Sequence, residues 1–308
     1  MTGASTSALG LGAVLVALGG AVANHLWRAA VRTRFERAHA RRFRFDAQGI
    51  VQGAAGFTLR ASDEDRVSRR AVLLLHGFND TAQSMAYLAA KLRARGYTVR
   101  VPLLPGHGRD LAGMACESRA MRWHEAVLAE YDALRREYDS VMVVGQSMGG
   151  ALSILLATDR PELPALVLLA PYVGMPRNLQ WKVLGAWIAR VALPYLRSVG
   201  GETSIHDPAA RADSLGPGVV TARTLTELRR VAEDAEAALS RVWVPTLYLQ
   251  SRQDNRIAAR DAETHFAALG SADKRQQWLT GCGHIISADY CRDEVASLTA
   301  DWLDAHAV

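Results

Sequence analysis

One ten-residue stretch, 141–150, constrains this chain more than any other. It reads Val-Met-Val-Val-Gly-Gln-Ser-Met-Gly-Gly, and a helix-like segment follows over 151–157. A strand that runs through G-x-S-x-G into a helix is typical of a turn that presents a nucleophilic serine, here Ser147. A Cβ at Gly145 or Gly149 would clash with a neighbouring strand or helix, so glycine is needed at both places. The alternative interpretation is a glycine-rich strand-to-helix turn without chemistry.

Short runs of Val and Leu alternate with amphipathic helical patterns along most of the chain. We expect strands at 72–75, 97–101, 141–144, 166–170, 246–250 and 275–279, with shorter β-like pieces within 42–59. We expect helices at 82–95, 123–137, 151–157, 257–269 and 292–305. Continuous apolar strands that alternate with helices predict an α/β fold, with a mostly parallel sheet covered by helices on both faces.

The alternation stops between about 172 and 240, where the sequence is helical and Trp-rich and has no clear strand. Apolar residues recur there at helical spacing, namely Trp181, Leu184, Trp187, Ile188 and Val191. Such a stripe is often simple core packing. Its position between two strands favours a helical cap over the carboxyl edge of the sheet, where ligands bind in open α/β folds. We therefore expect Trp181 and Trp187 to contact substrate.

Three residues have the types and positions that acyl transfer requires. Ser147 is the candidate nucleophile, His284 the candidate base and Asp254 the acid that would orient it. Each follows a predicted strand, so all three side chains should emerge at one edge of the sheet. A lone aspartate in a loop more often caps a helix, and Asp254 could cap the helix expected near Ile257. Asp261 is a second available acid.

The residues after the first buried strand, Leu-His-Gly-Phe at 75–78, are candidates for the oxyanion site. The backbone N–H groups of Phe78 and Met148 are the expected pair of donors. His76 precedes this loop, and we expect it to brace the loop through its ring nitrogens. We expect His107 to be a structural or rim residue, and His124 to lie on a helix surface or contact the cap.

The first 44 residues differ from the rest of the chain. Residues 1–27 contain no charged side chain, and 28–44 carry seven arginines against one glutamate, a net +6. The total charge is +5, which leaves −1 for 45–308 and argues against a nucleic-acid enzyme. As a helix, 8–27 would be ~30 Å long, about one hydrocarbon core. We expect a transmembrane anchor at 1–27 and an Arg-rich juxtamembrane segment at 28–44.

The hydrolase domain expected at 45–308 would then lie on the cytoplasmic side, because the basic flank follows the apolar segment. A cleaved signal peptide is the alternative, since Ala21-Val22-Ala23 has the small-x-small form of a cleavage site. That alternative implies export. Residues 1–7 lack the positive charge of such a signal, and the arginines would oppose export.

The three cysteines, Cys116, Cys282 and Cys291, predict neither a disulfide framework nor a zinc site, because their number is odd and their spacing is not that of metal ligands. We expect unpaired thiols, no metal and no cofactor. Cys282 lies two residues before His284 and could line the site.

Five motifs resemble the bacterial carboxylesterase and monoacylglycerol lipase group of α/β-hydrolases, over roughly residue 49 to the C-terminus. They lie at 76–85, 105–108, 145–150, 251–254 and 283–290. The resemblance implies the α/β-hydrolase fold and carries the family's nucleophile, acid and base onto Ser147, Asp254 and His284. Its oxyanion donors fall on Phe78 and Met148. The N-terminal segment and the cap depart from the family pattern, so substrate choice does not carry over.

The sequence therefore predicts a serine hydrolase of carboxylic esters with short-to-medium acyl chains, with monoacylglycerols among the candidate substrates. A thioesterase or another acyl hydrolase would use the same three residues. A non-catalytic, membrane-tethered binding protein on a hydrolase fold is the alternative from another class. The sequence does not give the oligomeric state.

Overall fold

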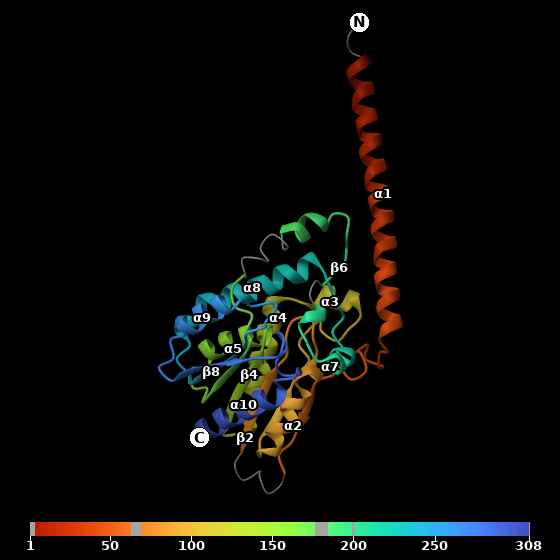
Figure 1. Ribbon diagram of the computed structural model, residues 1–308. Coiled ribbons are helices and arrows are strands. Elements are labelled where there is room, and N and C mark those ends of the chain that lie inside the picture. Colours follow the sequence, from red (N-terminus) through yellow and green to blue (C-terminus); the bar gives the residue numbers. More distant parts are fainter. Residues whose placement is uncertain (1–3, 63–68, 176–183, 199–200, 308) are drawn as a thin grey trace.

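A seven-stranded, mostly parallel sheet forms the centre of the molecule (Figure 1). The computed structural model describes residues 4–62, 69–175, 184–198 and 201–307, and the side chains of 4–15 and 202 are not among those described. The strands run in the order β1 (Phe57–Leu59), β3 (Thr98–Val101), β2 (Arg70–Leu75), β4 (Ser140–Gln146), β5 (Leu166–Leu169), β8 (Thr246–Ser251) and β9 (Lys274–Leu279). Only β1 runs antiparallel to its neighbour. The predicted α/β architecture is confirmed.

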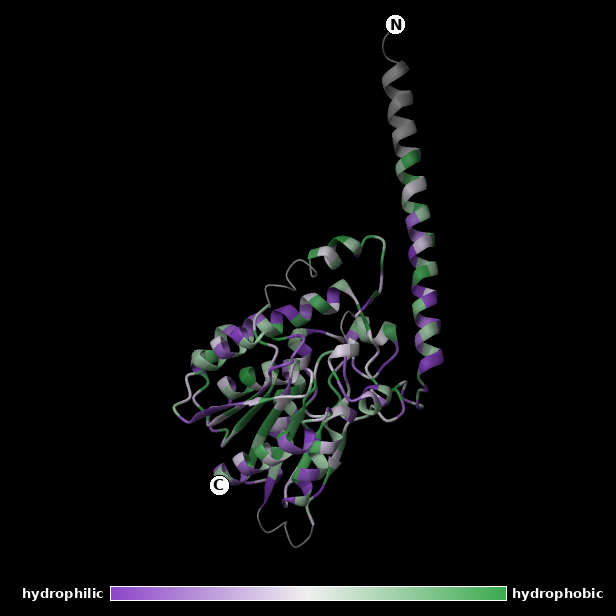
Figure 2. Cartoon of the chain, in the orientation of Figure 1, coloured by the Kyte–Doolittle hydropathy of each residue, from purple (hydrophilic) through white to green (hydrophobic). Residues whose placement is uncertain are grey.

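Helices cover both faces of this sheet. On one face lie α4 (Ala120–Glu137), α5 (Met148–Asp159), α8 (Ala222–Ala238) and α9 (Ala259–Ala268). On the other lie α2 (Ala86–Ala94) and α10 (Arg292–His306). Successive strand side chains point to opposite faces. In β2, for example, Leu73 and Leu75 therefore join the first core, whereas Val72 and Leu74 join the second. Figure 2 shows the strands as a largely hydrophobic layer between these helices.

The inserted region after β5 is less purely helical than we expected. It contains a helical turn at 184–189, a 3-10 turn η3 (Gly201–Thr203), the short helix α7 (Pro208–Asp213) and α8. It also contains a two-stranded antiparallel ribbon of β6 (Leu196–Arg197) and β7 (Val219–Val220), where the sequence showed no clear strand. Two-residue strands carry too little apolar alternation to be visible in a sequence. α8 packs on α5 in the main core.

The N-terminal part is one long helix, α1 (Ala4–Arg42), which projects away from the body toward its N-terminal end (Figure 1). Toward the C-terminal end of α1 the hydrophilic residues become more frequent (Figure 2). Part of the anchor predicted at 1–27 lies outside the described structure, namely residues 1–3 and the side chains of 4–15. Within the described residues, no helix is both long and apolar enough to cross a bilayer.

Specific contacts join the C-terminal half of α1 to the inserted region. Asn24 donates to the Val191 carbonyl at 3.1 Å, and Arg28 donates to the same oxygen at 2.8 Å. Further along, the Tyr195 hydroxyl donates to Glu36 at 3.0 Å. The Arg-rich segment is therefore a continuation of α1 that packs on the body.

Two cysteines form a disulfide, contrary to our expectation. Cys282 and Cys291 are joined across nine positions of sequence, in the loop that carries His284, whereas Cys116 is free and exposed. With three cysteines one must stay unpaired, so an odd number does not argue against a single bond. The two partners meet because the loop after β9 folds back on itself before α10 begins at Arg292.

We expect this disulfide to stabilise the fold by about 2–3 kcal/mol, because closing a loop of this length restricts the unfolded chain by that order. The double substitution C282A/C291A should lower the free energy of unfolding in urea by this amount. Cys116→Ala should leave it unchanged. Thiol titration of the denatured, unreduced chain should find one free thiol, and three would refute the bond.

Candidate active site

Ser147 sits on a strained turn between β4 and α5. Its φ of 55° and ψ of −116° are rare for a residue with a side chain. The turn is tight because the chain must pass directly from the strand into the helix. A Cβ on Gly149 would lie 2.3 Å from the Leu75 carbonyl oxygen, and one on Gly145 would lie 2.3 Å from the Gly149 oxygen. Both glycines are therefore required by close backbone approach, as the sequence indicated.

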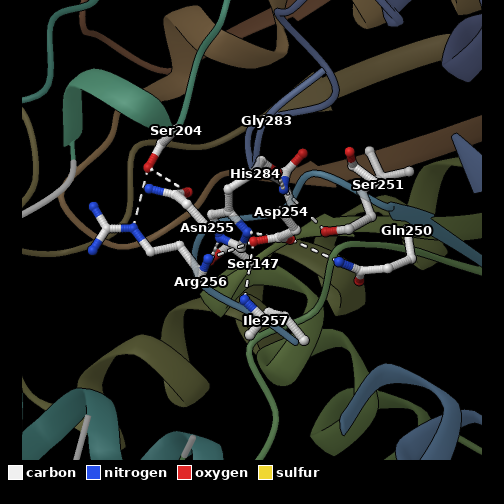
Figure 3. Close-up of polar contacts among 12 residues, drawn as sticks. Ser147, Ser204, Gln250, Ser251, Asp254, Asn255, Arg256, Ile257, Gly283 and His284 are labelled. Atoms are coloured by element: carbon white, nitrogen blue, oxygen red, sulfur yellow. Dashed lines mark hydrogen bonds and ion pairs between the residues drawn. The ribbon is translucent and has the colours of Figure 1, made fainter. Parts of the chain in front are cut away.

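Ser147, His284 and Asp254 form one hydrogen-bonded chain (Figure 3). The Ser147 Oγ lies 2.8 Å from His284 Nε2, and His284 Nδ1 lies 2.8 Å from Asp254 Oδ2. The carboxylate can only accept, so Nδ1 carries the proton and Nε2 turns its lone pair toward the serine hydroxyl. This arrangement suits proton removal from Ser147.

The sheet explains why these residues meet, although 137 positions separate Ser147 from His284. β4, β5, β8 and β9 are parallel neighbours, so their carboxyl ends lie at one edge. Ser147 directly follows β4, Asp254 lies three residues beyond β8, and His284 lies five residues beyond β9. Ligands bind at this edge in open α/β folds.

The Asp254 carboxylate is fully enclosed and well supplied with donors. Burial by itself would raise its pKa, but the charge of His284 and hydrogen bonds from His284, Ile257 and Arg256 lower it overall. Oδ1 accepts from the Arg256 and Ile257 N–H groups at 2.7 and 2.9 Å. Gln250 donates to Oδ2 at 2.7 Å. Asp254 therefore orders the turn before α9 with one oxygen and holds His284 with the other, whereas Asp261 lies in the first turn of α9.

The loop that carries Phe78 lies against the serine. A Cβ on Gly77 would be 3.2 Å from the Ser147 Cβ. Among the described residues, the N–H groups of Phe78 and Met148 donate to no other backbone or side-chain acceptor. Met148 begins α5, so the positive end of that helix also faces this space. Two free donors beside a nucleophile suit an oxyanion.

His76 braces this loop, as the sequence predicted. Its Nδ1 lies 2.9 Å from the Gly77 carbonyl oxygen, and its Nε2 accepts from the Leu104 N–H at 3.1 Å. Burial, reinforced by neighbouring His107, lowers the pKa of His76 to about 3. The ring is therefore neutral and acts as a fixed strut.

Aromatic rings form a wall next to Phe78. Its ring packs edge-on against His107 and Trp123. The Trp123 indole donates to the Pro105 carbonyl at 2.7 Å, which holds the loop of His107 in place. A narrow pocket beside this wall is also lined by Met114 and by His39 of α1, among others. His107 is thus structural, and His124 pairs with Asp159 on the helix surface.

The two tryptophans expected at the substrate have different outcomes. Trp181 lies outside the described residues. Trp187 is 52% exposed and lines a cavity of about 620 Å³ between α1, the turn at 184–189 and the start of α8. The lining of that cavity does not include Ser147, Asp254 or His284.

Several contributors were not identified from the sequence. Gln146 donates at 3.1 Å to the His284 carbonyl, which ties the base to the strand that ends at the nucleophile. Gln250 and Asp289 likewise support the acid and the base. Glutamine at the end of a strand has no distinctive spacing, so no signal marked Gln146 or Gln250. In the described part of the chain, no group of three or more His, Cys, Asp or Glu side chains is placed to hold a metal ion.

A further buried acid lies on the loop that carries Phe78. Asp80 is almost fully buried and accepts from the Ser84 hydroxyl at 2.6 Å and from the Thr81 N–H at 2.8 Å. Burial raises the pKa of Asp80 to about 6, although these hydrogen bonds and the charge of His284 act in the opposite direction.

Comparison with known proteins gives a consistent picture. Residues 66–290 match the family model described as "Serine aminopeptidase, S33". A thermostable monoacylglycerol lipase from Bacillus sp. strain H-257 is 28% identical over 236 residues, which covers 77% of this chain and 91% of that protein. A carboxylesterase from Bacillus subtilis strain 168 is 26% identical over 252 residues, covering 80% and 95%.

Solved structures agree. A structure reported for the metagenome-derived lipolytic enzymes LipS and LipT matches with a TM-score of 0.73 and 27% identity, over 82% of this chain and 98% of that one. Monoacylglycerol lipase from Paleococcus ferrophilus matches with a TM-score of 0.69 at 20% identity, over 82% and 98%, and supports the fold alone.

The raised pKa of Asp80 predicts how stability changes with pH. Between the unfolded value of 3.8 and about 6, the native state holds a proton that the unfolded chain has lost. Ionisation therefore costs stability as pH rises through this window, and the cost persists above it. The free energy of unfolding in urea should therefore rise for Asp80→Asn relative to the parent, by about 2–3 kcal/mol from pH 3.5 to pH 7.5. Asp234→Asn, on the exposed side of α8, is the control, and a pH-independent difference for Asp80→Asn would refute the assignment.

Proposed function

This chain belongs to the S33 serine aminopeptidase family of α/β-hydrolases, and we propose that it hydrolyses carboxylic esters through an acyl-enzyme on Ser147. The hydrogen-bonded chain Ser147–His284–Asp254 carries the proposal. The substrates are esters of short-to-medium acyl chains, including monoacylglycerols. Relatives named monoacylglycerol lipase and carboxylesterase support this substrate class.

The reaction begins with His284 Nε2, which takes the hydroxyl proton while Ser147 Oγ attacks the ester carbonyl carbon. The carbonyl oxygen becomes an oxyanion and accepts hydrogen bonds from the Phe78 and Met148 N–H groups. Each such donor contributes about 3 kcal/mol to the transition state. The intermediate collapses, the C–O bond to the alcohol breaks, and His284 returns its proton to the departing oxygen.

Deacylation repeats these steps with water as the nucleophile. His284 takes a proton from water, the hydroxide attacks the acyl carbon, and Ser147 leaves with the proton from His284. Asp254 stays ionised throughout and stabilises the imidazolium that forms twice in each cycle. The lowered pKa of Asp254 suits this role.

Ser147→Ala should lower ester hydrolysis by at least about 10⁴-fold, because the covalent step is lost. The assay is a series of p-nitrophenyl esters and monoacylglycerols of increasing acyl length. Ser240→Ala, at an exposed serine far along the chain, should retain activity and labelling by a fluorophosphonate probe. Unchanged turnover by a folded Ser147→Ala would exclude the mechanism. Preferred turnover of thioesters would reassign the substrate class.

The N-terminal helix supports a membrane location. Twenty residues of α1 precede Asn24, the first described α1 side chain with a hydrogen bond to the body. They span ~30 Å, the thickness of a hydrocarbon core. More than half of the side-chain surface is exposed at several apolar residues nearby, namely Val16, Leu18, Val22, Leu26, Trp27, Trp187, Ile188 and Val191. This apolar surface contacts lipid, and the arginines after it face the headgroups.

The disulfide indicates on which side of the membrane the catalytic domain lies. Disulfides persist in oxidising compartments and are rare in the cytosol. The Cys282–Cys291 bond therefore favours an oxidising compartment over the cytoplasmic location that the arginines suggested, and this proposal keeps α1 uncleaved. The proposed catalytic domain lies on the oxidising side of the membrane, tethered by α1.

The full chain should sediment with membranes and should not be extracted by alkaline carbonate. Carbonate removes proteins that are bound at the surface but not a helix that lies within the hydrocarbon core. Deleting residues 1–23 should release it while keeping the contacts of Asn24 and Arg28 with Val191. Full-length Asn24→Ala is the control and should stay with the membrane. Extraction of the full chain by carbonate would contradict the anchor.

A further inference from the structure

We infer that Asp289 is a positioning residue that ties the inserted segment 203–207 to the loop of His284 and thereby holds the imidazole against Ser147. This inference rests on the proposed function. Asp289 lies five residues after His284, and its side chain touches none of the reacting atoms in the hydrogen bonds that the structure contains.

The contacts of Asp289 converge from two parts of the chain. The residue is fully buried, at 0% exposure. Oδ2 accepts from the N–H groups of Gly283, at 2.7 Å, and of His206, at 2.8 Å. Oδ1 accepts from the N–H groups of Asp207 and Tyr290, both at 2.8 Å. One carboxylate therefore joins the residue before the base to two consecutive residues of the insertion.

Backbone groups stabilise this buried charge. In the described residues no lysine, arginine or histidine forms an ion pair with Asp289. Burial alone would raise its pKa, but the N–H groups of Gly283, His206, Asp207 and Tyr290 lower it overall. Hydrogen bonds to an ionised acceptor are the stronger kind, so the four of them favour one fixed geometry.

The backbone of His284 is held on both sides by this arrangement. Its predecessor Gly283 donates to Asp289, and its successor Ile285 donates to the Ser204 carbonyl at 2.9 Å. A Cβ on Gly283 would lie 2.7 Å from that same carbonyl oxygen, so glycine is needed for the segment to come this close. The His284 carbonyl accepts from Gln146.

The same segment also holds the loop of the acid. Asn255 donates to the Thr203 hydroxyl at 2.7 Å. The Arg256 guanidinium donates to the Ser204 hydroxyl at 3.1 Å (Figure 3). Asn255 and Arg256 directly follow Asp254. The loops of the acid and the base therefore rest on one inserted segment, and Asp289 supplies the charged part of that contact.

The disulfide does not replace this link. Cys282 and Cys291 close the loop that contains both His284 and Asp289, so the bond limits how far the loop can open. It joins two residues of that loop and makes no bond to 203–207. The contacts of Asp289 and Ile285 cross from the loop to the inserted segment.

Asp289→Asn tests the inference, because it keeps the shape of the side chain and removes its charge. Its NH2 group also cannot accept from the backbone N–H groups that one carboxylate oxygen now binds. We expect kcat for a p-nitrophenyl ester to fall about 10–100-fold with KM nearly unchanged, as for a base displaced by a fraction of an ångström. The pH dependence of kcat should shift, because the His284–Asp254 alignment changes. Asp213→Asn removes an exposed charge at the far end of α7, away from the contacts of Asp289, and it should leave kcat and its pH profile unchanged.

Hydrogen exchange separates this inference from the proposed function. In Asp289→Asn, amides of 203–207 and 282–290 should exchange faster than in the parent, whether or not the chain hydrolyses esters. An inactive parent would refute the function alone. A parental kcat in folded Asp289→Asn, or an equal loss of kcat in Asp213→Asn, would overturn the positioning role. If Asp289→Asn does not fold, Asp289→Glu keeps the charge on a longer arm, and parental kcat in it would overturn the role.

Discussion

The hydrogen bond between Asp254 and His284 is the interaction on which the candidate site depends. Removing a carboxylate from water costs several kcal/mol unless partners replace the solvent. Here the two oxygens receive donors from the His284 ring, Gln250 and two backbone N–H groups. These partners come from two segments, the end of β8 with the turn that follows it and the loop after β9, so the bond requires that this edge of the sheet is assembled. The chemistry and the fold are therefore coupled at this carboxylate.

Much of the fold could be predicted because its determinants are local. Apolar runs such as 141–144 are buried on both faces of a parallel sheet, and this burial shows directly in composition. The turn at Ser147 could be predicted for a similar reason. A Cβ at Gly145 or Gly149 would clash with the backbone, so the turn needs glycine at both positions and the requirement appears directly in the sequence. The order of Ser147, Asp254 and His284 after successive strands then implied a common edge. Their catalytic roles remain the proposal made above.

What could not be predicted depends on contacts between distant segments. Nothing in the sequence pairs Cys282 with Cys291 rather than with Cys116, because the choice depends on how the loop after β9 folds. The ribbon of β6 and β7 pairs Leu196 with Val220 and Arg197 with Val219, which are 24 and 22 positions apart, and it has no periodicity of its own. Asp289 is one acid among 31, and only the approach of 203–207 distinguishes it.

The inserted region therefore has two connections with different consequences. At one end Val191 accepts from Asn24 and Arg28 of α1, which sets the region beside the proposed membrane anchor. At the other end 203–207 holds the loops of the acid and the base. The same insertion thus contacts both the helix proposed to face lipid and the proposed catalytic machinery. Both contacts belong to one stretch of chain between β5 and β8.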